Sequence, residues 1–154
     1  MSITLHVNGR AALVAADPTT PLLDVLRNTL DLKGSRYGCG LEQCGSCMVL
    51  VDGEPVHACS REVGTVAGRR IETVESLADH PLRQAFLDEQ AGQCGYCLSG
   101  ILVTAKALLD RTPRPTREQI VAALDKHLCR CGTQSRIIRA VERASVLLTE
   151  GAAR

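Results

Sequence analysis

Four cysteines within one short stretch constrain this chain more than any other feature. The stretch reads Y-G-C-G-L-E-Q-C-G-S-C-M-V-L-V-D-G-E-P-V-H-A-C from residue 37 to residue 59, and its cysteines are Cys39, Cys44, Cys47 and Cys59. The order C-x4-C-x2-C, with a fourth cysteine further on, is typical of four thiolates that hold a [2Fe-2S] cluster of the plant type. Glycines among the first three cysteines let the backbone approach a small cluster and point N–H groups at its sulfurs. We therefore predict one [2Fe-2S] cluster at this stretch.

A second set of four cysteines lies in the C-terminal half. It comprises Cys94-x-x-Cys97 and, after 31 intervening residues, Cys129-x-Cys131. Each pair falls between two predicted helices, where the free N–H groups of a helix N-terminus supply partial positive charge. An oxidised [2Fe-2S] cluster with four thiolates has a net charge of about −2, so facing helix starts would stabilise it. We expect these four cysteines to hold a second cluster.

Other uses of eight cysteines remain as alternatives. Disulfides fit poorly, because the N-terminal residues alternate like a strand and give no export signal, and the cysteine density of about 5% is below that of disulfide-stapled miniproteins. Zinc also takes four cysteines, and C-x-x-C is common in zinc knuckles. A redox pair of Cys94 and Cys97 would leave the other two cysteines of that set unexplained. Histidine ligands would need Cys-x-His pairs, which are not found around His6, His57, His80 or His127.

Composition excludes several classes of partner. The formal net charge is +1, and the only aromatic residues are Tyr37, Phe86 and Tyr96. A chain with so little positive charge and so few stacking rings gives no basis for binding nucleic acid. The apolar runs are too short to cross a bilayer, so we expect no transmembrane segment. Together with the lack of an export signal and cysteines that suit a reducing compartment, this favours a cytoplasmic protein that meets a membrane only through its partners.

The first 76 residues are predicted to form a small sheet crossed by a helix. Asn8-Gly9 and Asp52-Gly53 are turn dipeptides that predict two hairpins, with strands at 3–7, 11–15, 48–51 and 56–59. A helix should begin at Thr20-Pro21, bury a stripe of leucines and end at Lys33-Gly34. One more strand is expected at 70–74. This order is typical of a ferredoxin-like β-grasp domain.

The remaining residues, 77–154, have helical periodicity. Helices are predicted at 81–91, at 97–110, from the capping-box pair Thr116 and Gln119 through a stripe that ends at Leu128, and at 137–148. Four helices of this length make a small bundle. The chain is therefore predicted to be α+β, with a β-grasp domain at 1–76 followed by a four-helix bundle domain at 77–154.

Four motifs resemble one known family. Y-G-C-G-L-E-Q-C-G-S-C, V-D-G-E-P-V-H-A-C, Q-C-G-Y-C and L-C-R-C-G-T look like segments of the small iron–sulfur subunit of molybdenum hydroxylases, the xanthine oxidase/aldehyde oxidoreductase family. The resemblance runs from Val7 to about Ala144. Within the family the chain is most similar to bacterial small subunits of nicotinate dehydrogenase and isoquinoline 1-oxidoreductase. Many members have C-T-P-G and C-R-C-T-G-Y where this chain has Cys97-Leu98-Ser99-Gly100 and C-R-C-G-T-Q, which leaves the substrate open.

The resemblance implies a role in electron transfer. The carbon chemistry would occur at a molybdopterin, of the cytosine dinucleotide form in bacterial relatives, on a separate large subunit. Electrons would pass through the cluster of Cys94, Cys97, Cys129 and Cys131, which is proximal to molybdenum, and then through the distal cluster to an acceptor such as a cytochrome c or a flavin subunit. Gln93 and Cys131 would lie near the pterin, and no residue of this chain would be catalytic.

The substrate implied by the resemblance is an N-heteroaromatic compound, nicotinate-like or isoquinoline-like. Three other hypotheses remain. The chain could belong to an aldehyde-oxidising member of the same family, it could be a free-standing two-cluster ferredoxin, or it could be a zinc-stabilised interaction module.

Overall fold

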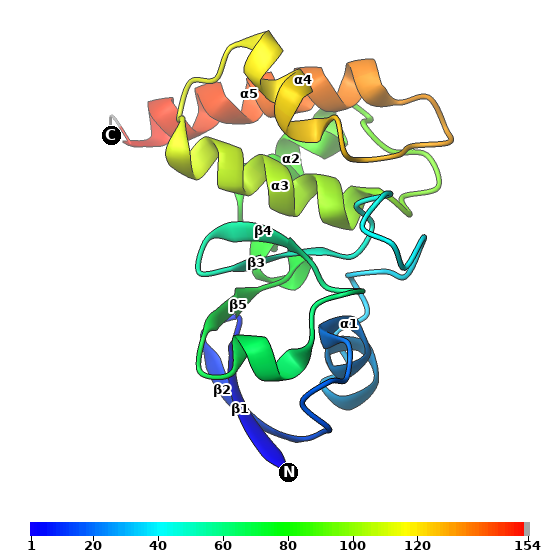
Figure 1. Ribbon diagram of the computed structural model, residues 1–154. Coiled ribbons are helices and arrows are strands. Elements are labelled where there is room, and N and C mark those ends of the chain that lie inside the picture. The colour runs from blue at the N-terminus through cyan, green and yellow to red at the C-terminus, as the bar shows by residue number, and fades with distance from the viewer. Residues whose placement is uncertain (153–154) are drawn as a thin grey trace.

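The computed structural model describes residues 1–152 and consists of a five-stranded mixed sheet below a layer of four helices (Figure 1). The strand order in the sheet is β2-β1-β5-β3-β4. β1 lies antiparallel to β2 and parallel to β5, and β3 lies antiparallel to both β4 and β5. The strands are β1 (Ser2–Val7), β2 (Arg10–Ala15), β3 (Met48–Val51), β4 (Glu54–His57) and β5 (Arg70–Glu72).

Both predicted hairpins form, and their turns have the backbone that the dipeptides require. Asn8 and Gly9 have φ of 51° and 79°, and Asp52 and Gly53 have φ of 50° and 84°. Positive φ at both central residues matches the right-handed twist of the two flanking strands. The returning strand of the second hairpin was predicted at 56–59, but β4 runs from Glu54 to His57. Its four residues pair with the four residues of β3, from Val51–Glu54 beside the turn to Met48–His57. β5 is likewise shorter than predicted.

The helix across the sheet is shorter than the sequence predicts. It runs as α1 (Leu22–Asp24) and then as one π-helical segment, η1 (Val25–Thr29), in which the Leu30 N–H donates to the Val25 carbonyl at 3.0 Å. The predicted end at Lys33-Gly34 is wrong, because Asp31 already adopts a left-handed φ of 56° that a helix cannot continue through. The buried stripe is nevertheless correct at Leu22 and Leu26, both with no exposed surface.

The C-terminal half contains the four predicted helices, α2 (Pro81–Asp88), α3 (Leu98–Arg111), α4 (Arg117–Leu124) and α5 (Gln134–Ala152). α2 stops before the predicted end, ahead of Gln90 with its φ of 48°. The predicted stripe through Leu128 is also wrong, since α4 ends at Leu124 and Leu128 is 63% exposed in the following loop. The capping box of Thr116 and Gln119 is confirmed in both of its hydrogen bonds. Two short 3-10 segments, η2 (Val63–Val66) and η3 (Val74–Leu77), complete the fold.

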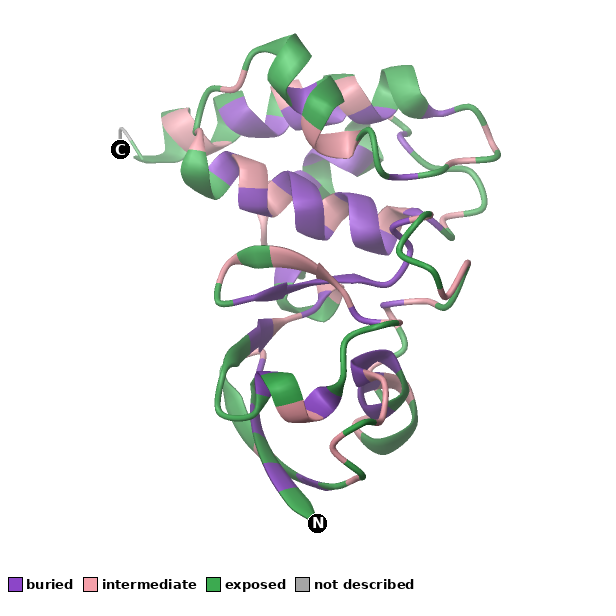
Figure 2. Cartoon of the chain, in the orientation of Figure 1, coloured by how far each residue is buried: buried purple, intermediate pink, exposed green. Residues whose placement is uncertain are grey.

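Strand β3 joins the two layers, because all four of its residues are buried. Val49 and Val51 point into the core beneath the sheet, whereas Met48 and Leu50 pack with Val103 and Ala107 of α3. Figure 2 shows α3 buried along most of its length where it lies over the sheet. This continuous packing fixes the loops at the ends of β3 and α3, where cysteines of both sets are found.

His80 gives the fold a pH dependence at the start of α2. Its Nδ1 accepts a hydrogen bond from the Leu82 N–H at 3.2 Å, so the neutral ring caps the helix. Burial, and to a smaller extent Lys106, lowers the pKa of His80 below its ordinary value of 6.5, against the opposing effect of Asp110. Because the pKa is lower in the folded state, the free energy of unfolding is largest above 6.5 and falls as the pH drops through the folded value.

We expect His80→Asn to reduce this pH dependence, since asparagine caps a helix without titrating. Urea unfolding at about pH 7.5 and about pH 5.5 would measure it, because these values bracket the ordinary histidine pKa. The loss of stability between the two should be smaller in the variant than in the parent. Equal losses in the two proteins would show that His80 does not titrate as described.

Candidate metal centres

Three cysteines of the first set lie in the loop before β3, and the fourth follows β4. Cys39 and Cys44 are adjacent, with the Cys39 N–H donating to the Cys44 Sγ at 3.4 Å. Cys47 and Cys59 are within hydrogen-bonding reach of each other. A Cβ on Gly38 would lie 2.6 Å from the Cys44 Sγ, so only glycine fits at that position. The structure therefore brings together all the cysteines of this set as two neighbouring pairs.

Backbone N–H groups of the loop point at sulfur, as a cluster requires. The amides of Leu41 and Gln43 donate to the Cys39 Sγ at 3.3 and 3.2 Å. These two hydrogen bonds lower the pKa of Cys39 to about 7. Burial instead raises the pKa of Cys47 to about 12. A bound metal would displace the proton from such a thiol, because the thiolate is the form that ligates.

The second set is also arranged in pairs. Cys94 lies within reach of Cys131, and Cys97 lies within reach of Cys129. As predicted, both pairs lie between helices, with Cys97 as the N-cap residue of α3. Burial of Cys129 opposes its ionisation, but hydrogen bonds from Thr133 and from the Cys131 amide lower its pKa to about 6. Burial and the neighbouring Cys129 raise the pKa of Cys97 to about 12.

The pairwise arrangement fits a dinuclear cluster. All eight cysteines are free thiols. Two irons bridged by sulfide each take two thiolates, so two neighbouring pairs match a [2Fe-2S] cluster better than one tetrahedral zinc ion. The amide donors to sulfur support the same assignment.

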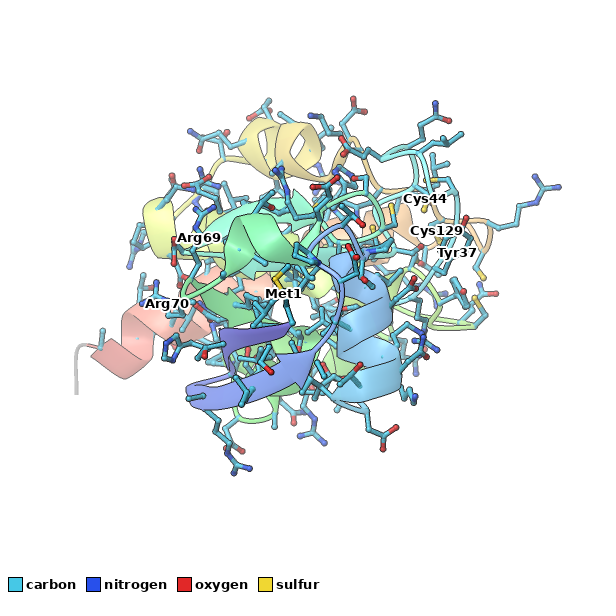
Figure 3. The ribbon with its side chains drawn as sticks, turned by 60° about the horizontal axis from the view of Figure 1, so that its bottom comes forward. Met1, Tyr37, Cys44, Arg69, Arg70 and Cys129 are labelled. Carbon is cyan, nitrogen blue, oxygen red and sulfur yellow. The ribbon has the colours of Figure 1, made fainter. Side chains whose placement is uncertain are left out.

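The two cysteine sites meet at a close contact between Gly45 and Gly100. A Cβ on Gly100 would lie 1.9 Å from the Gly45 carbonyl oxygen, so the backbones touch. Beside this contact the Leu128 N–H donates to the Cys44 carbonyl at 3.1 Å. Figure 3 shows Tyr37, Cys44 and Cys129 at one end of the molecule. The segments that carry the two sites are thus in direct contact.

His127 fills the space next to this contact. Its ring packs against Gly45, its Nε2 lies 2.9 Å from the Thr104 hydroxyl, and its side chain is buried. Burial, and then His57, lowers the pKa of His127 to about 4, so the ring is neutral at pH 7. This histidine is a packing residue between the two sites.

Gln93 lies beside the second site. Its side-chain amide donates to the Cys131 carbonyl at 3.4 Å, so the structure brings together the two residues that the family resemblance places near a pterin. Gln93 also lines a surface cavity of about 560 Å³ whose walls include Phe86, Leu87 and Leu98. The cavity gives this edge of the helical layer a mostly apolar depression that reaches Gln93 and is bordered by Arg83 and Arg136.

Sequence reasoning missed several residues that shape these sites. Gly100 fell within a predicted apolar helix and received no role of its own, and neither did Arg36, Tyr96 or Thr133. The signal available for Gly100 was a glycine inside a helix, which is unfavourable unless something approaches the backbone closely.

In the part of the chain that the structure describes, no helix is long and apolar enough to span a bilayer.

Comparison with known proteins identifies both halves. Residues 5–78 match the family described as "2Fe-2S iron-sulfur cluster binding domain", and residues 71–142 match the "[2Fe-2S] binding domain". A nicotinate dehydrogenase subunit of Pseudomonas putida is 53% identical over 148 residues, which are 94% of either chain. The alpha subunit of isoquinoline 1-oxidoreductase from Brevundimonas diminuta is 44% identical over 93% of this chain and 97% of that protein.

A solved structure has the same fold over nearly the whole chain. Quinoline 2-oxidoreductase from Pseudomonas putida 86 matches with a TM-score of 0.93 and 33% identity, over 98% of this chain and 97% of that one. The predicted fold class and the predicted family are both confirmed. The chain belongs to the family of small [2Fe-2S] iron–sulfur subunits of the molybdenum hydroxylases, a group of oxidoreductases.

Proposed function

We propose that this chain is the electron-transfer subunit of a molybdenum-dependent hydroxylase. It passes electrons from a molybdopterin site on a large partner subunit, through two [2Fe-2S] clusters, to an external acceptor such as a cytochrome c or a flavin subunit. The observation that carries the proposal is the pairing of cysteines at two sites that meet where the Gly45 loop touches the first turn of α3 at Gly100. Each bound cluster supplies one-electron redox chemistry, and the chain contributes ligands, N–H donors and burial.

We propose that each of the two cysteine sites holds one cluster. We assign one cluster to Cys39, Cys44, Cys47 and Cys59, in a β-grasp domain of residues 1–76. The other we assign to Cys94, Cys97, Cys129 and Cys131, in the helical domain of residues 77–154. We place the helical-domain cluster nearer the pterin, because the hydrogen bond from Gln93 to Cys131 and the apolar cavity beside it suit a docked partner.

The substrate we propose is an N-heteroaromatic compound of the nicotinate or isoquinoline kind. Identities of 53% and 44% to subunits of enzymes named for such rings support this choice over an aldehyde. The pterin on the partner is then the cytosine dinucleotide form. Eight free thiols also support a reducing, cytoplasmic compartment.

Metal analysis of anaerobically purified protein tests the clusters. We expect about four irons and four acid-labile sulfides per chain, two of each for every [2Fe-2S] cluster. Colourless protein with zinc and no sulfide would show a zinc-stabilised interaction module instead.

Co-purification of the native protein tests the subunit role. We expect the chain to be isolated with a large molybdopterin-binding subunit. A monomer that carries both clusters but never such a partner would be a free-standing ferredoxin.

A further inference from the structure

One arginine of the first cysteine loop holds the second cysteine loop. Arg36 Nη1 donates to the carbonyl of Gly95 at 2.6 Å, and its Cζ lies 5.3 Å from the centre of the Tyr96 ring. Gly95 and Tyr96 are the two residues between Cys94 and Cys97. The hydrogen bond therefore joins the loop of the first cysteine set to the Cys94–Cys97 turn of the second set. The two bonded residues are 59 positions apart in the sequence.

The contact is anchored on both sides. The Arg36 N–H donates to the Ser46 carbonyl at 3.0 Å, which ties the arginine to the residue before Cys47. The Tyr96 hydroxyl donates back to the Tyr37 carbonyl, two residues before Cys39. We name this set of contacts the Arg36–Tyr96 clamp. Its two side chains cross the gap between the sites in opposite directions, so neither loop can shift without breaking a hydrogen bond.

The charge of Arg36 is not neutralised by a carboxylate. Six other arginines pair with acidic side chains, as Arg69 does with Asp52 at 2.7 Å. Within residues 1–152, by contrast, no carboxylate oxygen lies within 4.0 Å of the Arg36 guanidinium. Its partners are a carbonyl and a ring face, which leave its full positive charge between two loops that each bind an anionic centre.

We propose that Arg36 is a positioning residue shared by the two clusters, which fixes their separation through the clamp and raises the reduction potential of both. The inference rests on the proposed function. A fixed cation stabilises the extra electron on a nearby anion, and partial burial limits screening by solvent. Tyr96 contributes by holding the guanidinium over its ring, so that the charge remains between the sites.

Redox titration of the intact holoenzyme, followed by EPR, tests the proposal. In Arg36→Met both cluster midpoints should move to more negative potentials, by roughly threefold or more in the reduction equilibrium constant, which is about 28 mV for a one-electron couple. The magnetic splitting between the two reduced clusters should also change, because it depends on their separation and orientation. Arg10→Met is the matched control, since it removes an exposed arginine from the first position of β2, on the β1–β2 hairpin.

Two milder variants keep the test valid if Arg36→Met does not assemble. Arg36→Lys retains the charge but loses the planar group, and Tyr96→Phe retains the ring but loses the hydroxyl. Both should leave the midpoints close to those of the parent while the splitting changes. Unchanged splitting in both would overturn the positioning role, and equal midpoint shifts in Arg36→Met and Arg10→Met would overturn the role of the charge. If the parent gives no cluster signal at all, the proposed function itself is wrong.

Discussion

Cys131→Ser is expected to abolish turnover of the assembled enzyme while one [2Fe-2S] EPR signal survives. Cys131 pairs with Cys94 at the second site, and its carbonyl accepts the hydrogen bond from Gln93. Serine is a poor ligand for iron that prefers thiolate, so the helical-domain cluster should be lost or altered. In the electron route proposed above, the loss of this cluster would leave no path from the partner's pterin to the β-grasp cluster.

Two further variants make the result specific. Cys44→Ser should remove the other signal and leave that of the helical domain, because Cys44 belongs to the first site. Arg130→Gln changes the exposed residue between Cys129 and Cys131, and it should keep both signals. Survival of both signals unchanged in Cys131→Ser would contradict the ligand assignment.

Gly100→Ala should cost more stability than any other single methyl group added to a glycine of this chain. Its Cβ would lie 1.9 Å from the Gly45 carbonyl oxygen and 2.9 Å from the carbonyl carbon, and both are backbone atoms that no rotamer can move. Overpacking of this severity costs about 3 kcal/mol, at the upper end of the usual range. Alanine returns about 1 kcal/mol of helix propensity. The net loss should therefore be about 2 kcal/mol in the free energy of unfolding.

Gly151→Ala is the matched control for this variant. Gly151 also lies in a helix, but nothing lies within 4 Å of its added Cβ. Alanine there should be neutral or stabilising by up to about 1 kcal/mol. Urea unfolding of both variants, together with iron content, measures the difference. If Gly100→Ala unfolds at the same urea concentration as the parent, the Gly45 loop can move away from α3 at little cost and the contact is not rigid.

Local chemistry decided which parts of the fold could be predicted from sequence. The hairpin turn at Asn8-Gly9 and the capping box at Thr116 depend on neighbouring residues alone, and both are correct. The end of the first helix was missed because a π-helical turn and a left-handed Asp31 have no sequence signature comparable to glycine. The stripe through Leu128 was extended too far, since an exposed leucine in a loop looks the same in sequence as a buried one in a helix.

The cysteine sites show the same limit. Spacing was sufficient to divide eight cysteines into two sets, and the structure brings the members of each set together as pairs. Spacing could not reveal how the sets meet, because the Gly45–Gly100 contact and the Arg36–Tyr96 clamp join residues more than 50 positions apart. Contacts of that kind follow from tertiary packing and carry no periodic signal.

Strand β3 has a consequence for how such a protein can be dissected. Val49 faces one hydrophobic core, and Met48 and Leu50 face the other, so β3 is buried on both faces. A fragment that ends at Leu77 would keep all five strands of the sheet. It would, however, expose the apolar face of β3 that α3 covers, and an exposed apolar face promotes aggregation. We therefore expect the half that contains the sheet to need the helical half for solubility, so the chain has to be expressed and engineered as one unit.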